Sequence, residues 1–540
     1  MGVRDLFFFG VVLVGTATLG AGLFRPAGSS ATRPGDKAAA SKPGADPRPA
    51  VAEVNAAIRK GWVEKNLDAA PQAPELAVMR RLSLALTGSI PSLEEIRRFE
   101  KRPAGARIDA WVDDLLHDRR FADYLAERMA RAFVGTEDGP FVLFRRRRFA
   151  SWLSDAILAN RPYDAIVRDM IADKGLWTDH PATNFVSVTF NPDEGRPDPE
   201  RLAARVSRAF LGVRIDCAQC HDHPFQPWKQ GDFRSLAAFF GEARSDLRGI
   251  GDGEARYHPL DRKTKEATDV SPRVPSLPEL CPDSGSARER LAAWVVNPKN
   301  PSLARATTNR VWALLLGRPL VEPVDDLPLD APLPPALTVL ADDFSSHGFD
   351  LHRLIRLIVA SEVFRLDSLG GSGSDSPSDA HDTAWAAFPM TRLRPEQVAG
   401  ALYQSASLTT LGPGSHWVTR FFSYTSRNDF VRRYGDTGED EFDARAGTIP
   451  QRLLLMNGDL AQKMIKQDPL NASTQIAALS PDDRKAVEVA YLSILTRRPS
   501  AEESAHFEAR LKGTDGDERK GRLTDLYWTL LNSTEFSWNH

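Results

Sequence analysis

Two cysteines three positions apart, with a histidine directly after the second, are the residues of this chain whose types and spacing could do chemistry. They are Cys217, Cys220 and His221. This spacing is the attachment pattern of a c-type haem, in which the thiols add to the vinyl groups and the imidazole ligates iron. With only 3 cysteines and 11 histidines in 540 residues, chance would place the pattern in fewer than about one chain in a thousand. We therefore expect covalent haem c, with His221 as the iron ligand.

The same spacing also serves zinc, dithiol redox chemistry and a local disulfide. A zinc site would use Cys217, Cys220, His221 and His223, although structural zinc usually joins two separated pairs of ligands. A disulfide between Cys217 and Cys220, or a purely structural role, is the other alternative. Thioredoxin-like chemistry fits poorly, because there the motif opens a helix, whereas here the helical pattern precedes it. The third cysteine, Cys281, lies in a proline-rich stretch and is expected to be an unpaired buried thiol.

The apolar residues upstream predict the element that carries the thiols. Leu202, Val206, Phe210 and Val213 recur at three- and four-residue intervals, and the interval continues into the two cysteines. This pattern predicts one helix with both sulfurs on its buried face. Since a proline disfavours helical geometry in the residue before it, we expect that helix to end near His221 or Asp222.

The sequence does not determine the role of His223 or the second axial ligand of such an iron. His223 is expected to be either a hydrogen-bonding neighbour of the haem or a turn histidine. A second axial ligand has to be a methionine or histidine, and no spacing selects one of the candidates. These are Met129, Met170, Met456, Met464, His180 and His258.

No other group of residues indicates a reaction, so no catalytic residue is assigned and it stays open whether the chain is an enzyme. Three acidic clusters, at 325–326, 342–343 and 439–441, lack the spacing of a known hydrolase and are interpreted as solvated faces. Arg145–Arg148 is interpreted in the same way, with a phosphate or acidic-partner site as the lesser alternative. Asn309, Arg310 and Trp312 are given a structural interpretation, in which the arginine hydrogen-bonds across a helix packing joint.

The numbers of basic and acidic residues indicate which kinds of partner the protein can have. The chain has 69 basic and 72 acidic residues and a net charge of −3, so no global basic excess favours nucleic acid as a partner. Residues 6–24 are uncharged and apolar or small, and as a helix they would just cross a hydrocarbon core of about 30 Å. We predict a signal anchor or signal peptide over 1–24, followed by a flexible tether over 25–50. The protein is expected to be exported to the cell envelope or periplasm, anchored by residues 6–24.

Helical periodicity predominates in the rest of the chain, which predicts a mainly α, multi-helical fold of two domains. The first is expected over 51–245 and the second over 287–540, joined by a loop-rich linker at 246–286 and interrupted by a flexible insertion at 370–380. Ser92 and Glu95 form a capping box that starts one helix. Residues 185–190 are expected to be a short extended connection.

Two sets of motifs give a family resemblance. The first set is 80–82, 86–88, Pro91, 207–212, 217–225 and 237–240, and the second is 308–312, 393–397, 455–458 and 531–536. The first set resembles the planctomycete cytochrome-C-like domain of unknown function 1549, and the second set resembles its usual partner, domain of unknown function 1553. The resemblance implies an exported protein and carries a cytochrome-like label that rests on the same Cys-x-x-Cys-His. The chain has no second copy of that motif, so a relay between two haems of one chain is excluded.

The sequence therefore predicts an exported cell-envelope protein with one covalent c-type haem and an electron-transfer or redox role. Its partner would be a redox or scaffold protein of the envelope, whose identity is unknown. The alternative is an envelope binding or scaffold protein without haem, in which Cys217 and Cys220 form a disulfide or bind zinc with His221 and His223.

Overall fold

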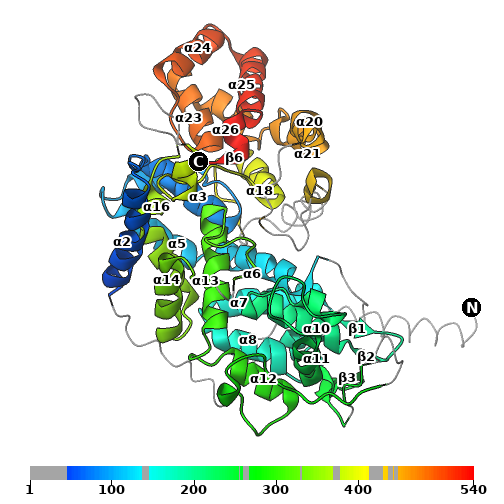
Figure 1. The fold of residues 1–540 in the computed structure, drawn as a ribbon. Helices are drawn as coiled ribbons and strands as arrows, with labels where there is room; N and C mark the ends of the chain where they lie inside the picture. Colours follow the sequence, from blue (N-terminus) through cyan, green and yellow to red (C-terminus); the bar gives the residue numbers. More distant parts are fainter. Residues whose placement is uncertain are drawn as a thin grey trace, which may run out of the picture. The chain divides into compact units, whose positions relative to one another are not determined.

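The computed structural model describes residues 46–136, 145–254, 256–259, 267–328, 331–368, 378–412, 430–435, 442 and 448–540. Across these residues helices predominate, and the strands form three separate two-stranded antiparallel pairs (Figure 1). The predicted mainly α fold is confirmed. The predicted anchor at 6–24 lies outside the described residues. Within the described ranges, no helix has both the length and the apolar character that a membrane span requires.

The first part of the described chain is mainly helical. Its helices are α2 (Arg48–Glu64), α3 (Glu75–Thr87), α4 (Leu93–Glu100), α5 (Arg107–Leu116), α6 (Arg119–Val134), α7 (Arg146–Leu158), α8 (Tyr163–Ala172) and the single turn α9 (Asn184–Ser187). Two sequence predictions need correction here. The tether cannot reach residue 50, because α2 begins at Arg48, and the predicted extended connection at 185–190 begins as α9. Phe185 and Val186 are completely buried, so an apolar run of this length suited a buried helical turn as well as a strand.

The region around the cysteine motif consists of short elements. They are β1 (Phe190–Asn191), β2 (Arg196–Pro197), α10 (Pro199–Val206), the π-helical turn η2 (Ser207–Leu211), the 3₁₀ turn η3 (Asp216–Gln219), α11 (Gln230–Ala237) and the 3₁₀ turn η4 (Ala238–Phe240). A hairpin of β3 (Ala243–Asp246) and β4 (Gly249–Asp252) follows. The predicted linker at 246–286 thus contains β4, and it also contains the 3₁₀ turn η5 (Pro278–Leu280).

The second half is again helical. Its elements are α12 (Ala287–Val295), α13 (Pro301–Leu316), α14 (Pro335–Ser346), α15 (Leu351–Ala360), α16 (Glu362–Arg365), α17 (Asp379–Thr383), β5 (Thr391–Arg392), α18 (Pro395–Ser405), α20 (Ile449–Asn457), α21 (Asp459–Ile465), α22 (Ala472–Leu479), α23 (Asp483–Leu495), α24 (Ala501–Leu511), α25 (Gly516–Leu531), α26 (Thr534–Ser537) and β6 (Trp538–Asn539). The insertion predicted at 370–380 lies mostly outside the described residues, and its last two residues already belong to α17.

Helix α13 connects the two halves of the chain. It packs against α14 and α15 of its own half and against α3 and η2 of the first half (Figure 1). Its residues from Thr307 to Leu316 are all buried, so this helix is enclosed on every side. Arg310, on α13, donates from Nη1 to the carbonyl of Ala209 in η2 at 3.1 Å, which confirms the predicted bond across a helix packing joint.

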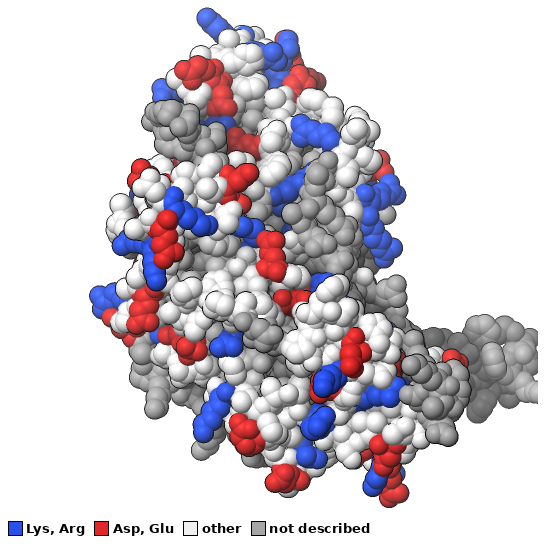
Figure 2. Space-filling model, viewed as in Figure 1, with Lys and Arg blue, Asp and Glu red and all other residues white. Residues whose placement is uncertain are grey.

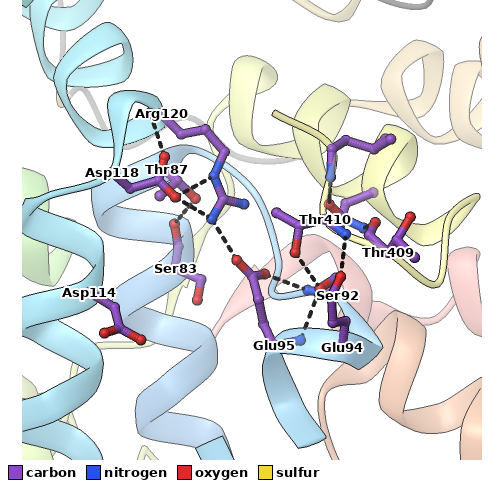
Figure 3. Close-up of polar contacts among 12 residues, drawn as sticks. Ser83, Thr87, Ser92, Glu94, Glu95, Asp114, Asp118, Arg120, Thr409 and Thr410 are labelled. Carbon is purple, nitrogen blue, oxygen red and sulfur yellow. Dashed lines mark hydrogen bonds and ion pairs between the residues drawn. The ribbon is translucent and has the colours of Figure 1, made fainter. Parts of the chain in front are cut away.

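The capping box predicted at Ser92 is present (Figure 3). Ser92 Oγ accepts from the Glu95 backbone N–H at 3.1 Å, and Glu95 Oε2 accepts from the Ser92 N–H at 2.8 Å. The other Glu95 oxygen accepts from Arg120 of α6. Ser92 Oγ also lies 2.9 Å from Thr410 Oγ1, beyond the end of α18. The N-terminus of α4 therefore links three segments, namely α4 itself, α6 and the chain around Thr410.

Candidate functional site

The helix that precedes the cysteine motif ends earlier than predicted. After α10 the chain makes the π-helical turn η2, and Gly212 then takes a left-handed conformation with φ 66°. A Cβ at this position would lie 3.0 Å from Ala306 Cβ and 3.2 Å from Leu327 Cδ1. The tight packing and the positive φ both favour glycine here and stop the helix. The prediction of one helix running to His221 is wrong.

The two thiols are consequently not on a buried helical face. Cys217 lies within η3 and Cys220 directly follows it, and both side chains are exposed and free. Ala218, one of the two residues between them, is completely buried, and Ile215 just before the turn is 3% exposed. These two apolar residues fix the turn on the core, so that the cysteines on either side of Ala218 face solvent.

His221 and His223 are in different hydrogen-bonding states. The Nδ1 of His221 lies 2.7 Å from the carbonyl oxygen of Asp222. A carbonyl only accepts, so Nδ1 carries the proton and Nε2 keeps its lone pair. The Nδ1 of His223 instead accepts from the backbone N–H groups of Phe225 and Gln226, at 3.2 and 3.0 Å. In neutral His223 the proton is therefore on Nε2. Of these two histidines, His221 is the one in the tautomer that offers Nε2 as a ligand.

The loop after the motif is closed by several bonds. The His223 backbone N–H donates to Trp228 O at 2.8 Å, and the Gln230 N–H donates to Asp222 Oδ1 at 2.9 Å. Gln226 Nε2 lies 3.2 and 3.3 Å from the two carboxylate oxygens of Asp326, in the loop after α13. Phe225 remains 93% exposed at its tip. His223 thus acts as a turn histidine, one of the two roles expected for it.

The alternatives for the motif can be compared with this geometry. Among the residues that the structure describes, which include all four zinc candidates, no group of three or more His, Cys, Asp or Glu side chains is placed to hold a metal ion. Cys217 and Cys220 do not form the predicted alternative disulfide either. Cys281 is free, as expected, but only half-buried, and burial raises the pKa of its thiol.

The candidates for the second axial ligand lie in different surroundings. Met129 and Met170 belong to the hydrophobic core, with exposed fractions of 1% and 0%. His180 Nδ1 lies 3.1 Å from both carboxylate oxygens of Asp173. His258 Nδ1 lies 3.9 Å from Asp269 Oδ1.

The structure shows a second feature that the sequence analysis missed, a cavity of about 860 Å³ lined by residues of both halves of the chain. Its lining includes Asp216, the residue before Cys217. Among the described residues, its lining includes eight arginines and three acidic residues, Asp216, Glu322 and Asp325. Three of the arginines, Arg201, Arg205 and Arg208, are spaced by four and three positions. That spacing places them on one helical face, and this signal could have indicated the cavity.

The acidic clusters do not all face solvent, which corrects the sequence analysis. Asp325 is 6% exposed, and its two oxygens accept from Arg208 Nε at 2.8 Å and Arg214 Nε at 2.9 Å. Burial alone would raise the pKa of Asp325, but the hydrogen bonds from the two arginines outweigh it and hold the pKa below its ordinary value. Asp343 is likewise bound by Arg353 through two bonds of 2.8 Å. The cluster at 439–441 lies outside the described residues.

The basic run at 145–148 also has local partners. Arg146 binds both oxygens of Glu127 at 2.9 Å, and the Arg145 guanidinium lies 5.2 Å from the centre of the Trp177 ring. These contacts support the structural interpretation of the run over the phosphate site.

Comparison with known families agrees with the motifs. The family PSCyt2, a protein of unknown function (DUF1549), matches residues 53–245, and the family PSD1, a protein of unknown function (DUF1553), matches residues 287–511, in the order predicted. The chain therefore contains a PSCyt2 region followed by a PSD1 region. No curated protein and no solved structure matches it. The cysteine motif lies inside the PSCyt2 region, whereas the cavity is lined by residues of both regions and by Trp538 and Asn539 beyond them.

Proposed function

We propose that this protein carries one covalent c-type haem at Cys217, Cys220 and His221 and serves electron transfer or another redox reaction of the cell envelope. The observation that carries the proposal is the state of the motif. Two free, exposed thiols flank a buried anchor residue, and the adjacent histidine is in the tautomer that leaves Nε2 available. Thioether formation needs both thiols accessible, and iron ligation needs that nitrogen.

The residues of the motif can hold a c-type haem, because they supply the thiols and the imidazole nitrogen that it requires. Cys217 and Cys220 would hold the porphyrin through thioether bonds, and His221 would ligate the iron through Nε2. The Asp222 carbonyl, accepting from Nδ1, would orient the imidazole and increase its basicity. The exposed ring of Phe225 gives an apolar surface close to the motif. Bound there, a haem would supply a one-electron redox centre whose potential depends on its ligands and burial.

The cell-envelope location is part of the proposal. The uncharged segment 6–24 would direct export and anchor the chain, which places the motif on the side of the membrane where covalent haem attachment occurs. The acceptor or donor of electrons would be another envelope protein. Membrane fractionation of the full chain and of a chain starting at residue 46 tests the anchor, since only the full chain should remain with the membrane after an alkaline wash.

Haem attachment is tested by producing the chain together with a cytochrome c maturation system. We expect a haem-stained band on a denaturing gel and a pyridine haemochrome spectrum of c-type haem. Cys217→Ser/Cys220→Ser should lose both signals. Cys281→Ser is the matched control, because Cys281 is also a free cysteine but lies outside the motif, and it should retain full haem content.

The two histidines give a second comparison. His221→Ala should change the absorption spectrum of any haem that is still attached, because the iron loses its ligand, whereas His223→Ala should leave that spectrum unchanged. A wild-type chain without haem, in cells where a known c-type cytochrome is matured normally, would contradict the proposal. Zinc or a disulfide found at the cysteines in that sample would support the scaffold alternative.

A further inference from the structure

The loop between α13 and α14 reaches the chain just before the cysteine motif. This loop belongs to the PSD1 region, whereas the motif belongs to the PSCyt2 region. The backbone N–H of Leu327 in the loop donates to Gly212 O at 2.7 Å. A Cβ on Gly212 would also lie 3.0 Å from Ala306 Cβ in α13 and 3.2 Å from Leu327 Cδ1. Two residues of the PSD1 region thus pack at the glycine where the helical stretch before the motif ends.

One carboxylate of the same loop contacts the chain both before and after the motif. Asp326 Oδ1 accepts at 3.1 Å from the backbone N–H of Arg214, which lies three positions before Cys217. Gln226 Nε2, five positions after His221, donates to Asp326 Oδ1 and Oδ2 at 3.3 and 3.2 Å. Asp326 therefore closes the base of a loop that contains the whole motif.

The neighbouring acid holds the chain on the upstream side. Asp325, which is 6% exposed, accepts from Arg208 Nε at 2.8 Å and from Arg214 Nε at 2.9 Å. Such charge-assisted bonds are stronger and more directional than bonds between neutral groups. The backbone and the side chain of Arg214 are thus bound by two consecutive residues of the PSD1 region, which fixes the entry to the motif.

The PSCyt2 region holds the middle of the motif with its own residues. Gln219, between the two cysteines, donates from Nε2 to the Glu200 carboxylate in α10, and its carbonyl accepts from Gln230 Nε2 at 3.2 Å. These bonds support the turn η3 from within its own region. The entry and the exit of the loop are instead joined through Asp326. Because the two kinds of support use different residues, they can be separated by substitution.

We propose that the PSD1 region positions the cysteine motif of the PSCyt2 region, with Asp326 as the positioning residue. Joining the two ends of a short segment reduces the number of conformations open to it. The bridge through Asp326 therefore restricts where Cys217, Cys220 and His221 lie relative to one another, as a site that holds a prosthetic group requires. As a statement about haem this inference rests on the proposed function, but the restriction itself belongs to the chain without haem.

The test is hydrogen–deuterium exchange on the full chain, produced without haem maturation and kept under a reductant. Three backbone N–H groups of the loop and its exit report on it, because each has an acceptor in the folded chain. They are Ala218 to Ile215 O at 2.9 Å, His223 to Trp228 O at 2.8 Å and Gln230 to Asp222 Oδ1 at 2.9 Å. Asp326→Ala should accelerate exchange at least about tenfold in peptides 213–221 and 222–230, since the base of the loop opens. Peptides of α24 should exchange as in the parent.

Three further variants give the comparison its specificity. Gln226→Ala removes only the contact after the motif, so it should accelerate peptide 222–230 more than peptide 213–221. Asp326→Asn keeps one carbonyl oxygen as an acceptor and should lie between the parent and Asp326→Ala. The matched control is Asp342→Ala, at an exposed acid of α14 in the PSD1 region. Acidic and basic side chains are interspersed on the face shown in Figure 2, so the loss of one surface carboxylate should leave exchange in the motif peptides unchanged.

Two results would overturn the proposal. One is exchange of both motif peptides in Asp326→Ala within about twofold of the parent. The other is an equal acceleration in the motif peptides and in α24, which would mean that the substitution destabilises the whole protein. If Asp326→Ala does not fold, Asp326→Asn and Gln226→Ala decide by the same two criteria. Because no haem enters the measurement, a chain that never acquires haem contradicts the proposed function and leaves this result unaffected.

Discussion

At the scale of single residues, His352 shows how burial determines a protonation state. It lies in α15, is 5% exposed, and packs edge-on against Phe121 and His117 with ring centres 5.6 and 6.3 Å apart. Burial lowers the pKa of His352 to about 4. The negative charge of Asp350 opposes this change, whereas the positive charges of Arg356 and His117 add to it. The folded protein therefore keeps His352 neutral at a pH where the unfolded chain protonates it.

This difference predicts a loss of stability in acid. The unfolded state binds a proton near pH 6.5 and the folded state only near pH 4, so the contribution of His352 is complete above pH 6.5 and declines as the pH falls toward 4. The decline should amount to about 3 kcal/mol. His352→Phe should flatten this part of the pH profile of urea unfolding, whereas His506→Phe, at an exposed histidine, should leave it unchanged. Equal slopes in His352→Phe and the wild type would contradict the prediction.

Asp325 gives a second prediction at this scale. Asp325→Asn keeps the shape of the side chain but removes the charge that compensates Arg208 and Arg214. Because Asp325 is buried while the two arginines are partly exposed, with 29% and 40% of their side chains accessible, we expect a loss of about 2 kcal/mol. The shift of the urea unfolding midpoint measures this loss of stability, provided that the dependence of the unfolding free energy on urea concentration is unchanged. Asp326→Asn is the matched control, because its bonds are to the Arg214 backbone and the Gln226 amide, and it should cost less than half as much.

At the scale of elements, the start of α4 was predictable because its signal is local. A serine followed three positions later by a glutamate is sufficient to form a capping box, and it formed. The sequence did not indicate that Ser92 would also be 1% exposed and bonded to Thr410. That contact joins residues 318 positions apart, and no local pattern encodes it.

The added contact predicts a difference between two capping serines. Ser500 forms the same box with Glu503 at the start of α24, but it is exposed. Ser500→Ala should cost about 1 kcal/mol, the usual value for a lost cap. Ser92→Ala should cost about twice that, because it also removes the partner of the Thr410 hydroxyl. Thermal or urea unfolding measures both, and a smaller loss for Ser92→Ala than for Ser500→Ala would refute the argument.

The element that carries the thiols was mispredicted for the opposite reason. The apolar spacing from Leu202 to Val213 is real, and each of these residues is buried, but burial continues through a π-helical turn and a 3₁₀ turn as well as through a helix. The helical stretch before the cysteines ends at Gly212, which packs against Ala306 and Leu327. The residue types of the site were therefore predictable, whereas the exposure of its thiols depended on packing against distant segments. The cavity likewise depends on arginines from several distant segments.

At the scale of the whole molecule, two buried arginines of α3 join the beginning of the described chain to its end. Arg80 Nη1 donates to Ile494 O at 2.9 Å and its Nη2 donates to Phe536 O at 3.4 Å. Arg81 Nη1 donates to the carbonyls of Phe364 and Leu366 at 3.2 and 2.6 Å. Burial lowers the pKa of Arg80 to about 10 and that of Arg81 to about 9. These guanidinium groups are satisfied only by the later part of the chain.

The two family regions should therefore depend on each other for folding. A fragment of residues 46–254 would expose the surface that α13 covers and leave both arginines without their carbonyl partners. We expect this fragment, and likewise residues 287–540, to lack the near-ultraviolet circular dichroism of the intact protein and to unfold without a cooperative transition. Mixing the two fragments should restore part of the signal. Cooperative unfolding of either fragment alone would contradict this dependence.

The bonds of Arg80 also have a consequence for the order of events in the cell. Its partner Ile494 lies 414 positions further along the chain, and at about 5 to 20 residues per second the ribosome needs roughly 20 to 80 seconds to make that stretch. Throughout this time α3 has been synthesised but has no native acceptor for its buried guanidinium. The first region therefore cannot complete its native packing around Arg80 before Ile494 has been synthesised.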